Sequence, residues 1–115
     1  MASRPDCAFC RIIAGQAPAD IIYSDERAIA FYDRSPRAPV HVLVVPLEHI
    51  ASLNDLTPEN ESLAGHLLLV ARRVAEQENI AHSGYRLIVN TGRGAGQVVL
   101  HLHLHILGGG GPLRL

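Results

Sequence analysis

The stretch QVVLHLHLHILGGGG, residues 97–111, carries three histidines at alternate positions on an aliphatic background. Successive side chains of a β-strand point to opposite faces, so His101, His103 and His105 would share one face of a strand. The leucines between them and Ile106 would fill the other face. Imidazoles bind metals and exchange protons near neutral pH, so the pattern predicts a strand that carries chemistry.

A glycine-rich loop, NTGRGAGQ (residues 90–97), comes directly before the histidines. Glycines at 92, 94 and 96 let the backbone approach a ligand closely and turn successive N–H groups toward an anion. A phosphate held beside imidazoles has a chemical purpose. A neutral imidazole can attack phosphorus, and a neighbouring imidazolium can donate a proton to the leaving group.

The residues alone leave two interpretations of the histidines open, a metal site and covalent nucleotidyl transfer without a metal. On a flat strand, residues i, i+2 and i+4 span about 13 Å. Zn–N bonds are only about 2.1 Å long, so binding of one ion by all three would need a bulge, although two of them could share an ion. The spacing therefore slightly favours covalent transfer.

The composition limits the class of protein. The chain has 115 residues, is 48% hydrophobic and carries a formal charge of −1, which predicts a single globular domain over residues 1–115. The sequence has no basic stripe, which argues against nucleic acid as the main partner. The apolar run LLLVA (67–71) ends at two arginines, so we expect no membrane span. The N-terminus lacks the apolar segment of a secretory signal, so we expect a cytoplasmic protein.

Apolar periodicity and turn residues predict the secondary structure. The expected elements are a short helix within residues 7–19 broken by Gly15 and Pro18, a hairpin over 21–33 with its turn at 24–26, a buried strand over 40–46 ended by Pro46, a long helix over 57–80 capped by Thr57, and strands over 84–90 and 101–107. Because strands and helices segregate along the chain, we expect an α+β fold with a mostly antiparallel sheet.

The predicted helix over 57–80 has a wide apolar face. It consists of two adjacent stripes, Leu63, Leu67, Val70 and Val74, and Ala64, Leu68, Ala71 and Ala75. Either the helix is deeply buried in its own core, or part of this face is a dimer contact. The N-terminal pair Cys7 and Cys10 forms a C-x-x-C motif, which in a reducing compartment indicates a metal knuckle or a redox pair.

The chain resembles the histidine triad (HIT) superfamily. Its motif H-φ-H-φ-H-φ-φ, where φ is hydrophobic, is matched by residues 101–107. The resemblance also includes CAFCRIIAGQAPADIIYSDERAIAFYDRSPRAP, HVLVVPLEHI and NTGRGAGQVVLHLHLHILGG, and covers roughly residues 6–110. The most similar branch is the Hint-like group of purine nucleotide phosphoramidases, in particular bacterial members that begin with C-x-x-C.

The resemblance implies roles for the site residues. His103 would be the nucleophile that forms a nucleotidyl–histidine intermediate, His105 would hydrogen-bond the phosphate or the leaving atom, and His101 would orient its neighbour. The implied nucleotide-binding set is Asp33 at the ribose, Phe31 and Ile13 around the base, Asn90 and backbone groups of Gly96 and Gln97 at the phosphate, together with Arg34 and Val98.

The resemblance also implies the activity. We expect hydrolysis or transfer at the phosphoramidate or mixed-anhydride bond of a purine nucleoside monophosphate adduct, with no organic cofactor. Val98 stands where the Hint pattern usually has a serine that helps the leaving group, so phosphoramidase efficiency should be reduced. The alternatives are a nucleotide-binding regulatory module with negligible turnover, a dinucleoside polyphosphate hydrolase, and a metal-storage or metal-sensing site.

Two further expectations follow from the same resemblance. A structural zinc ion would be held by Cys7, Cys10, His49 and His101, which leaves His103 and His105 for chemistry. Two chains would form a homodimer in which the five-stranded sheets join into one ten-stranded sheet. We expect the other histidines, His41, His66 and His82, to lie at the surface or in loops.

Overall fold

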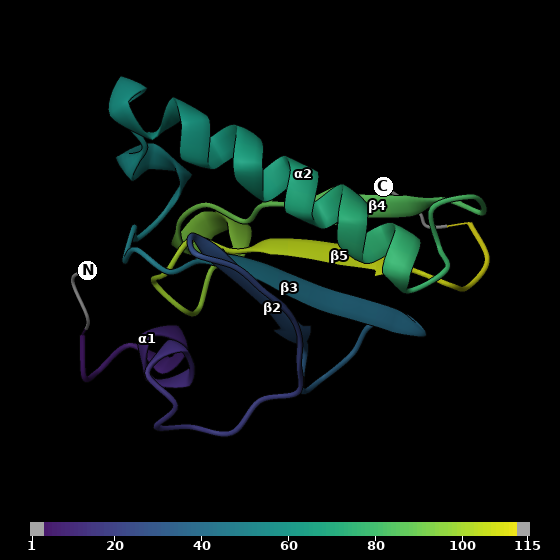
Figure 1. Cartoon of the computed structure of the whole chain (residues 1–115), viewed down its shortest axis with the longest axis horizontal. Coiled ribbons are helices and arrows are strands. Elements are labelled where there is room, and N and C mark those ends of the chain that lie inside the picture. Colours follow the sequence, from purple (N-terminus) through teal and green to yellow (C-terminus); the bar gives the residue numbers. More distant parts are fainter. Residues whose placement is uncertain (1–3, 113–115) are drawn as a thin grey trace.

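The computed structural model describes residues 4–112 of the chain. Its elements are α1 (Ala8–Ile13), β1 (Ile21–Ser24), β2 (Ala28–Tyr32), β3 (Val40–Pro46), two 3-10 turns (Leu53–Asp55 and Pro58–Asn60), α2 (Glu61–Gln77), β4 (Tyr85–Ile88), a third 3-10 turn (Arg93–Ala95) and β5 (Leu104–Gly108). The fold is thus the predicted α+β arrangement of one long and one short helix on a five-stranded sheet (Figure 1).

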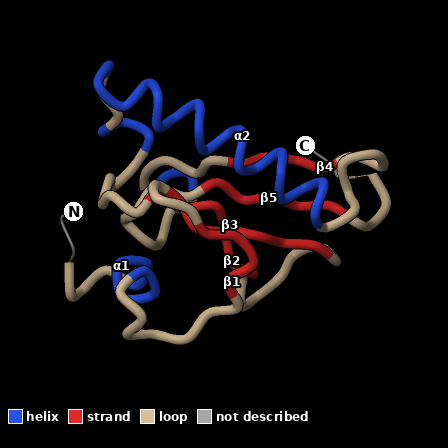
Figure 2. Tube along the Cα trace, in the orientation of Figure 1, coloured by secondary structure: helices blue, strands red, loops and turns tan. Residues whose placement is uncertain are grey.

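The five strands form one antiparallel sheet in the order β1-β2-β3-β5-β4. The sheet separates the two helices, with α2 on one face and α1 on the other (Figure 2). No helix in the described part of the chain has the length and hydrophobicity needed to cross a membrane.

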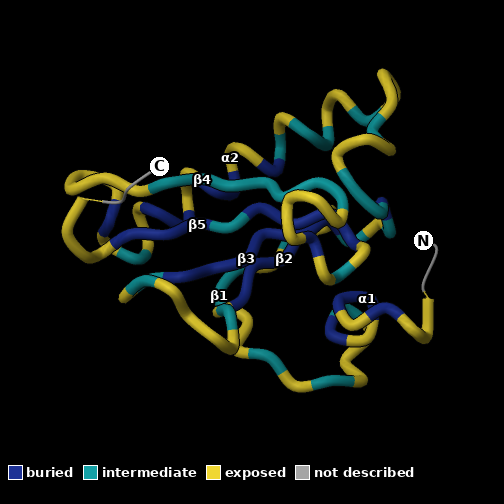
Figure 3. The backbone as a smooth tube through the Cα atoms, turned by 180° about the vertical axis from the view of Figure 1, so that it is seen from behind, coloured by how far each residue is buried: buried dark blue, intermediate teal, exposed yellow. Residues whose placement is uncertain are grey.

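Alternation along the central strands builds two cores. On β3, Val42 and Val44 face α2, whereas Leu43 and Val45 face α1. The strand is buried along most of its length (Figure 3) because both of its faces are covered. A continuous aliphatic strand such as this suits a position between two packed layers.

The hairpin and the long helix match the sequence prediction closely. The β1–β2 turn is held by Asp25, whose Oδ1 accepts hydrogen bonds from the N–H groups of Arg27 (2.7 Å) and Ala28 (2.8 Å). The helical region begins as a 3-10 turn after Thr57 and continues as α2 to Gln77. This 3-10 turn, Pro58–Asn60, is closed by Asn60 itself, whose Oδ1 accepts from the Thr57 N–H at 3.0 Å.

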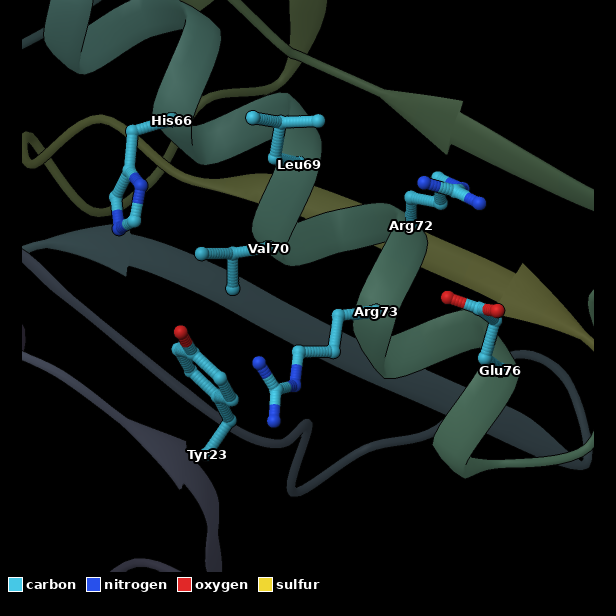
Figure 4. Close-up of a pocket in the computed structure, with 7 residues that line it drawn as sticks. All are labelled: Tyr23, His66, Leu69, Val70, Arg72, Arg73 and Glu76. Atoms are coloured by element: carbon cyan, nitrogen blue, oxygen red, sulfur yellow. The ribbon is translucent and has the colours of Figure 1, made fainter.

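A polar cluster ties α2 to this hairpin. Asp25 Oδ2 accepts from the Tyr23 hydroxyl at 2.6 Å and from His66 Nε2 at 2.6 Å. Arg73 lies over the Tyr23 ring at 5.7 Å, beside a small cavity between α2 and β1 (Figure 4). Burial acts to raise the pKa of Asp25, but these hydrogen bonds and the two N–H donors of the turn outweigh it and hold the pKa well below its usual range.

The last predicted strand, over 101–107, is partly wrong. β5 begins only at Leu104, so His101 and His103 precede the strand. Beyond the Val44–Leu104 pair, β3 reaches Pro46, which has no N–H to continue the ladder. Instead, the N–H of Leu102 donates to Ile50 O at 2.6 Å, which draws this segment away from the sheet.

Candidate active site

A large cavity lies on the α1 face of the sheet and has a volume of about 650 Å³. Residues from α1, the segment before β1, the β2–β3 connection and the loop after β4 meet there. Its lining consists of Ala8, Phe9, Ile12, Pro18, Ala19, Asp20, Phe31, Tyr32, Asp33, Arg34, Ser35, Arg37, His41, Leu43, Asn90, Gly96, Val98, Val99, His103 and His105. A cavity of this size with a few convergent polar groups is large enough to hold a nucleotide.

The structure separates the three histidines of the motif. His103 and His105 line the cavity, with ring centroids 5.0 Å apart. His101 is fully buried and is not among the lining residues. The alternate spacing therefore does not put three imidazoles side by side toward one ligand, because His101 belongs to a bent segment and not to a strand.

The hydrogen bonds of His103 define its tautomer. Its Nδ1 lies 2.7 Å from the carbonyl oxygen of His101. A carbonyl can only accept, so Nδ1 carries the proton and Nε2 holds a lone pair. Phe9 packs edge-on against the His103 ring at 5.0 Å and restricts its rotation. His103 is thus an oriented neutral imidazole with one basic nitrogen left for the cavity.

His41 corrects one expectation, since it is neither exposed nor in a loop. It lies on β3 with 3% of its surface exposed. Its Nδ1 accepts the N–H of Arg37 at 3.1 Å, so its proton is on Nε2, and Nε2 faces His105 Nδ1 at 2.9 Å. His41 therefore donates to His105. The signal in the sequence was a histidine within a strand of buried aliphatic residues.

This hydrogen bond also defines His105. Because its Nδ1 accepts from His41, a neutral His105 carries its proton on Nε2. Nε2 lies 3.5 Å from the carboxamide of Asn90, whose oxygen is the atom able to accept that proton, and a half-turn of the amide presents it. His103 and His105 thus offer the cavity a lone pair and an N–H donor respectively.

Burial keeps these imidazoles neutral. Burial is the largest of the causes that lower the pKa of His105 to about 4, and the neighbouring His103 and His41 contribute to the same decrease. Burial also lowers the pKa of His103, against the opposing effects of the His101 carbonyl and Asp33. Since a charged imidazole in this apolar surrounding is disfavoured, the lone pair of His103 is available at neutral pH.

Asp33 lies at the end of β2, next to the histidines. Its Oδ1 accepts the N–H of Ser35 at 2.8 Å, and its Oδ2 lies 3.5 Å from His41 Nε2. Asp33, His41 and His105 are close enough to be considered as metal ligands. However, tetrahedral zinc holds two imidazole nitrogens about 3.4 Å apart, whereas the 2.9 Å between His41 and His105 is a hydrogen-bond distance.

The glycine-rich loop differs from its expected use. The N–H of Gly96 donates to Arg93 O at 3.0 Å, and that of Gln97 to Gly92 O at 3.1 Å, so neither is left for a phosphate. The Gln97 side chain is buried and binds Gly92, Ala51 and Val99 through backbone groups. Gln97 therefore shapes the loop from inside and does not line the cavity.

Two other donors of the same loop have no partner among the described residues. The N–H groups of Val98 and Val99 make no hydrogen bond to any described residue, and both residues line the cavity. Val98 itself is 88% exposed. Successive unpaired N–H groups beside two imidazoles form a position that suits an anion.

The apolar end of the cavity lies between α1 and the sheet. Phe9, Ile12, Phe31 and Leu43 belong to the buried cluster on this side. Ile12 lines the cavity, whereas Ile13, which the sequence analysis named, packs against the cluster from outside the lining. On a helix as short as α1, neighbouring isoleucines differ by about 100° in direction, which sequence alone does not resolve.

A second cluster lies behind the cavity and could hold a metal ion. The side chains of Cys7, Cys10, His49 and His101 place one ligand atom each within 4.8 Å of one another. Both thiols are free. His101 Nε2 donates to Pro46 O at 2.8 Å, so its Nδ1 lone pair points to the thiols.

The distances in this cluster fit a tetrahedral ion. The sulfur–nitrogen separations are 3.4 Å for Cys7–His101, 3.2 Å for Cys10–His49 and 3.6 Å for Cys10–His101. Tetrahedral zinc with ordinary bond lengths requires about 3.6 Å between a sulfur and a nitrogen ligand. Burial lowers the pKa of both histidines, which leaves their ligand nitrogens unprotonated.

Comparison with known proteins agrees with this architecture. The chain is 48% identical to a purine nucleoside phosphoramidase of Escherichia coli over 101 residues, which cover 88% of this chain and 85% of that protein. It is 49% identical to a HIT-like protein of Synechococcus elongatus over 104 residues, 90% of each chain.

Solved structures give the same result. A histidine triad protein from Clostridium difficile superposes with a TM-score of 0.95 at 38% identity and 99% coverage of both chains. A HIT family hydrolase from Clostridium thermocellum gives a TM-score of 0.94 at 47% identity, covering 98% of this chain and 100% of that one. The HIT domain family model matches residues 14–111. The chain therefore belongs to the HIT domain family.

Proposed function

We propose that this chain is a nucleotide hydrolase that cleaves the phosphoramidate or mixed-anhydride bond of a purine nucleoside monophosphate adduct through a nucleotidyl–histidine intermediate. The observation that carries the proposal is the hydrogen bond from His103 Nδ1 to the His101 carbonyl. It leaves His103 Nε2 as a neutral nucleophile beside unpaired N–H groups. The similarity to a purine nucleoside phosphoramidase supports the same substrate class.

The reaction has two steps. The lone pair of His103 Nε2 forms a bond to the α-phosphorus, and the bond from phosphorus to the leaving nitrogen or oxygen breaks. The leaving atom keeps that electron pair and takes a proton from water, with the N–H of His105 hydrogen-bonded to it. Water then attacks phosphorus, the electron pair of the P–N bond returns to His103, and the proton of the water passes to solvent.

The remaining site residues position the nucleotide. Asp33 accepts from the ribose hydroxyls, and the apolar residues between α1 and β2, including Phe31, enclose the base. The N–H groups of Val98 and Val99 and the Asn90 carboxamide hold the phosphate oxygens, where negative charge develops during attack.

We propose that the cluster of Cys7, Cys10, His49 and His101 binds zinc. A zinc ion would fasten Cys7 and Cys10 at the start of α1 to His49 and His101, and its chemistry there is structural because four protein ligands leave no open position. Burial raises the pKa of the Cys7 thiol, so a bound cation is what would stabilise its thiolate. Two free thiols also suit a reducing, cytoplasmic location.

The proposed assembly is a homodimer. Leu68 and Leu69 of α2 are 56% and 63% exposed, and β4 is an unpaired edge of the sheet. Pairing two copies through these surfaces would cover the leucines and the open edge. Light scattering of the native protein and of Leu69→Glu tests this assembly, and a native monomer of about 12 kDa with full activity would refute it.

The activity is tested with purified protein, adenosine 5′-phosphoramidate and adenosine dinucleotides. We expect faster turnover of the phosphoramidate and a loss of several orders of magnitude in His103→Ala, with nucleotide binding retained. The exposed, apolar Val98 favours one alternative, a regulatory module that binds nucleotides without turnover. Nucleotide binding with no hydrolysis of either substrate would establish that alternative.

A further inference from the structure

The side chain of Gln97 is buried and binds only to the backbone. The residue is 7% exposed. Its Oε1 accepts the N–H of Gly92 at 2.8 Å, and its Nε2 donates to Ala51 O at 2.8 Å and to Val99 O at 3.0 Å. A buried polar group that loses its partner is costly, so a carboxamide that satisfies three backbone groups holds the chain segments it contacts in place.

Gln97 closes the glycine-rich loop by binding both polar groups of Gly92. Its own N–H donates to Gly92 O at 3.1 Å, while its side chain accepts the Gly92 N–H. Gly92 has a φ of 81°, in the left-handed region that favours glycine. The bond from Gln97 Nε2 to Val99 O then curls the next two residues around the same side chain. The segment that follows the loop therefore starts from a fixed point.

That segment, residues 98–101, is anchored at both ends to two adjacent residues. Before its first residue, Gln97 Nε2 donates to Ala51 O at 2.8 Å. After its last residue, the N–H of Leu102 donates to Ile50 O at 2.6 Å. The side chain of Gln97 thus supplies the first of the two anchors, and the backbone of Leu102 supplies the second.

The anchored segment carries the groups that the chemistry needs. The N–H groups of Val98 and Val99 make no hydrogen bond to any residue from 4 to 112, and both residues line the cavity. The carbonyl of His101 ends the segment and accepts from His103 Nδ1 at 2.7 Å. The position of the two anion donors relative to the imidazole of His103 therefore depends on the anchors at 97 and 102.

We propose that Gln97 is a positioning residue that holds the N–H groups of Val98 and Val99 at the right place for the phosphate attacked by His103. Gln97 does not line the cavity, so it acts through the backbone and not by contact with the substrate. The proposal rests on the proposed function, because it takes the phosphate of that nucleotide as the anion. Donors fixed in advance stabilise the charge that develops on the phosphate oxygens during attack.

The test measures how much the phosphate adds to nucleotide binding. Calorimetry gives the dissociation constants of adenosine and of adenosine 5′-monophosphate for the native protein and for Gln97→Met, whose side chain has a similar length but makes none of the three hydrogen bonds. We expect the ratio of the two constants, adenosine over monophosphate, to fall at least about tenfold in the variant, because hydrogen bonds to a charged group weaken. The affinity for adenosine should stay near the native value.

Kinetics of the same variant gives a second readout. With adenosine 5′-phosphoramidate as substrate, kcat of Gln97→Met should fall by a larger factor than KM rises, since the donors act most strongly on charge that develops in the transition state. A loss of structure alone would instead lower the amount of active protein and leave KM unchanged.

Two control variants separate positioning from stability. Val44→Ala removes buried methyl groups on the α2 face of the sheet, away from the cavity, and should lower the Tm without changing the binding ratio. Gln77→Met removes a comparable bond, from Gln77 Nε2 to Ile22 O at 2.8 Å, and should also leave the ratio unchanged.

A measurement on the native protein keeps the test valid if Gln97→Met does not fold. In NMR spectra, the monophosphate should move the amide proton signals of Val98 and Val99 downfield, and adenosine should not. Native protein without this phosphate-dependent shift overturns the inference. So does a folded Gln97→Met that keeps the native ratio, or one that loses affinity for both ligands equally. If the native protein shows the shift and Gln97→Met lowers the ratio, but no phosphoramidate is hydrolysed, the inference is upheld and the hydrolytic function is wrong.

Discussion

Removing one ligand of the cysteine–histidine cluster should destabilise the whole fold. The cluster joins segments that are distant in sequence, with 39 positions between Cys10 and His49 and 94 between Cys7 and His101. Closing loops of about 15 to 100 residues by a cross-link is worth about 3 to 4.7 kcal/mol in the chain-entropy model. The two loops that a metal ion at this cluster would close lie within this range.

The expected loss is therefore about 4 kcal/mol when Cys10→Ser prevents stable metal binding. For a chain of this size, 1 kcal/mol corresponds to about 4 °C in Tm, so the decrease should be about 15 °C. Turnover at low temperature should change less than stability, because none of the four residues of the cluster lines the cavity.

The assay compares thermal melts and metal content of the native protein, Cys10→Ser and the exposed loop variant His82→Asn. Chelation should lower the Tm of the native protein and of His82→Asn, and zinc should restore both. Cys10→Ser should start low and respond little to the chelator. A native Tm that does not move on complete metal removal would refute the reasoning, as would an equal response of Cys10→Ser.

Three further predictions concern other polar groups. His41→Ala should lower kcat by about 10- to 100-fold because His105 loses the donor that defines its tautomer. Steady-state kinetics of this variant, with His82→Ala as the control, measures the effect. An unchanged kcat would contradict the prediction. Because the pKa of His105 is lowered to about 4, protonation should reduce kcat/KM only below about pH 6, and an acid limb near 6.5 in a pH profile would contradict it. Asp25→Asn should lower the Tm at neutral pH by about 4 °C, or about 1 kcal/mol. Because the pKa of Asp25 is lower in the folded than in the unfolded chain, its carboxylate stabilises the fold above about pH 4, the pKa in the unfolded chain, and this stabilisation is lost as the pH falls. The Tm values of the native protein and of Asp25→Asn should therefore converge in acid. A difference in Tm that stays constant with pH would contradict this prediction.

Much of the fold could be predicted because its signals are local. The strand over 40–46 ends where Pro46 cannot donate, and the turn between β1 and β2 is held by Asp25 within the same hairpin. The bend of residues 101–103 could not be predicted in this way. It depends on the contact of Leu102 with Ile50, which lies 52 positions earlier in the chain.

The candidate site shows the same limit. The motif led to His103 and His105, but the partner that orients His105 is His41, 64 positions away. The position of His41 in the aliphatic strand over 40–46 predicts which face of the sheet it occupies, but not that it contacts His105. The glycine pattern predicted an anion-binding loop, whereas only the structure shows that the N–H groups of Val98 and Val99 make no hydrogen bond within residues 4–112.

The most direct test of the central claim is to trap the nucleotide on His103. Native protein would be mixed with a rapidly cleaved adenosine 5′-phosphoramidate, quenched within one turnover in alkaline denaturant that preserves a P–N bond, and analysed by mass spectrometry of its peptides. The account predicts one nucleotidyl group on His103, formed and lost at rates that match turnover, and none in His103→Ala. Full turnover without this adduct, or an adduct on another residue, would contradict it.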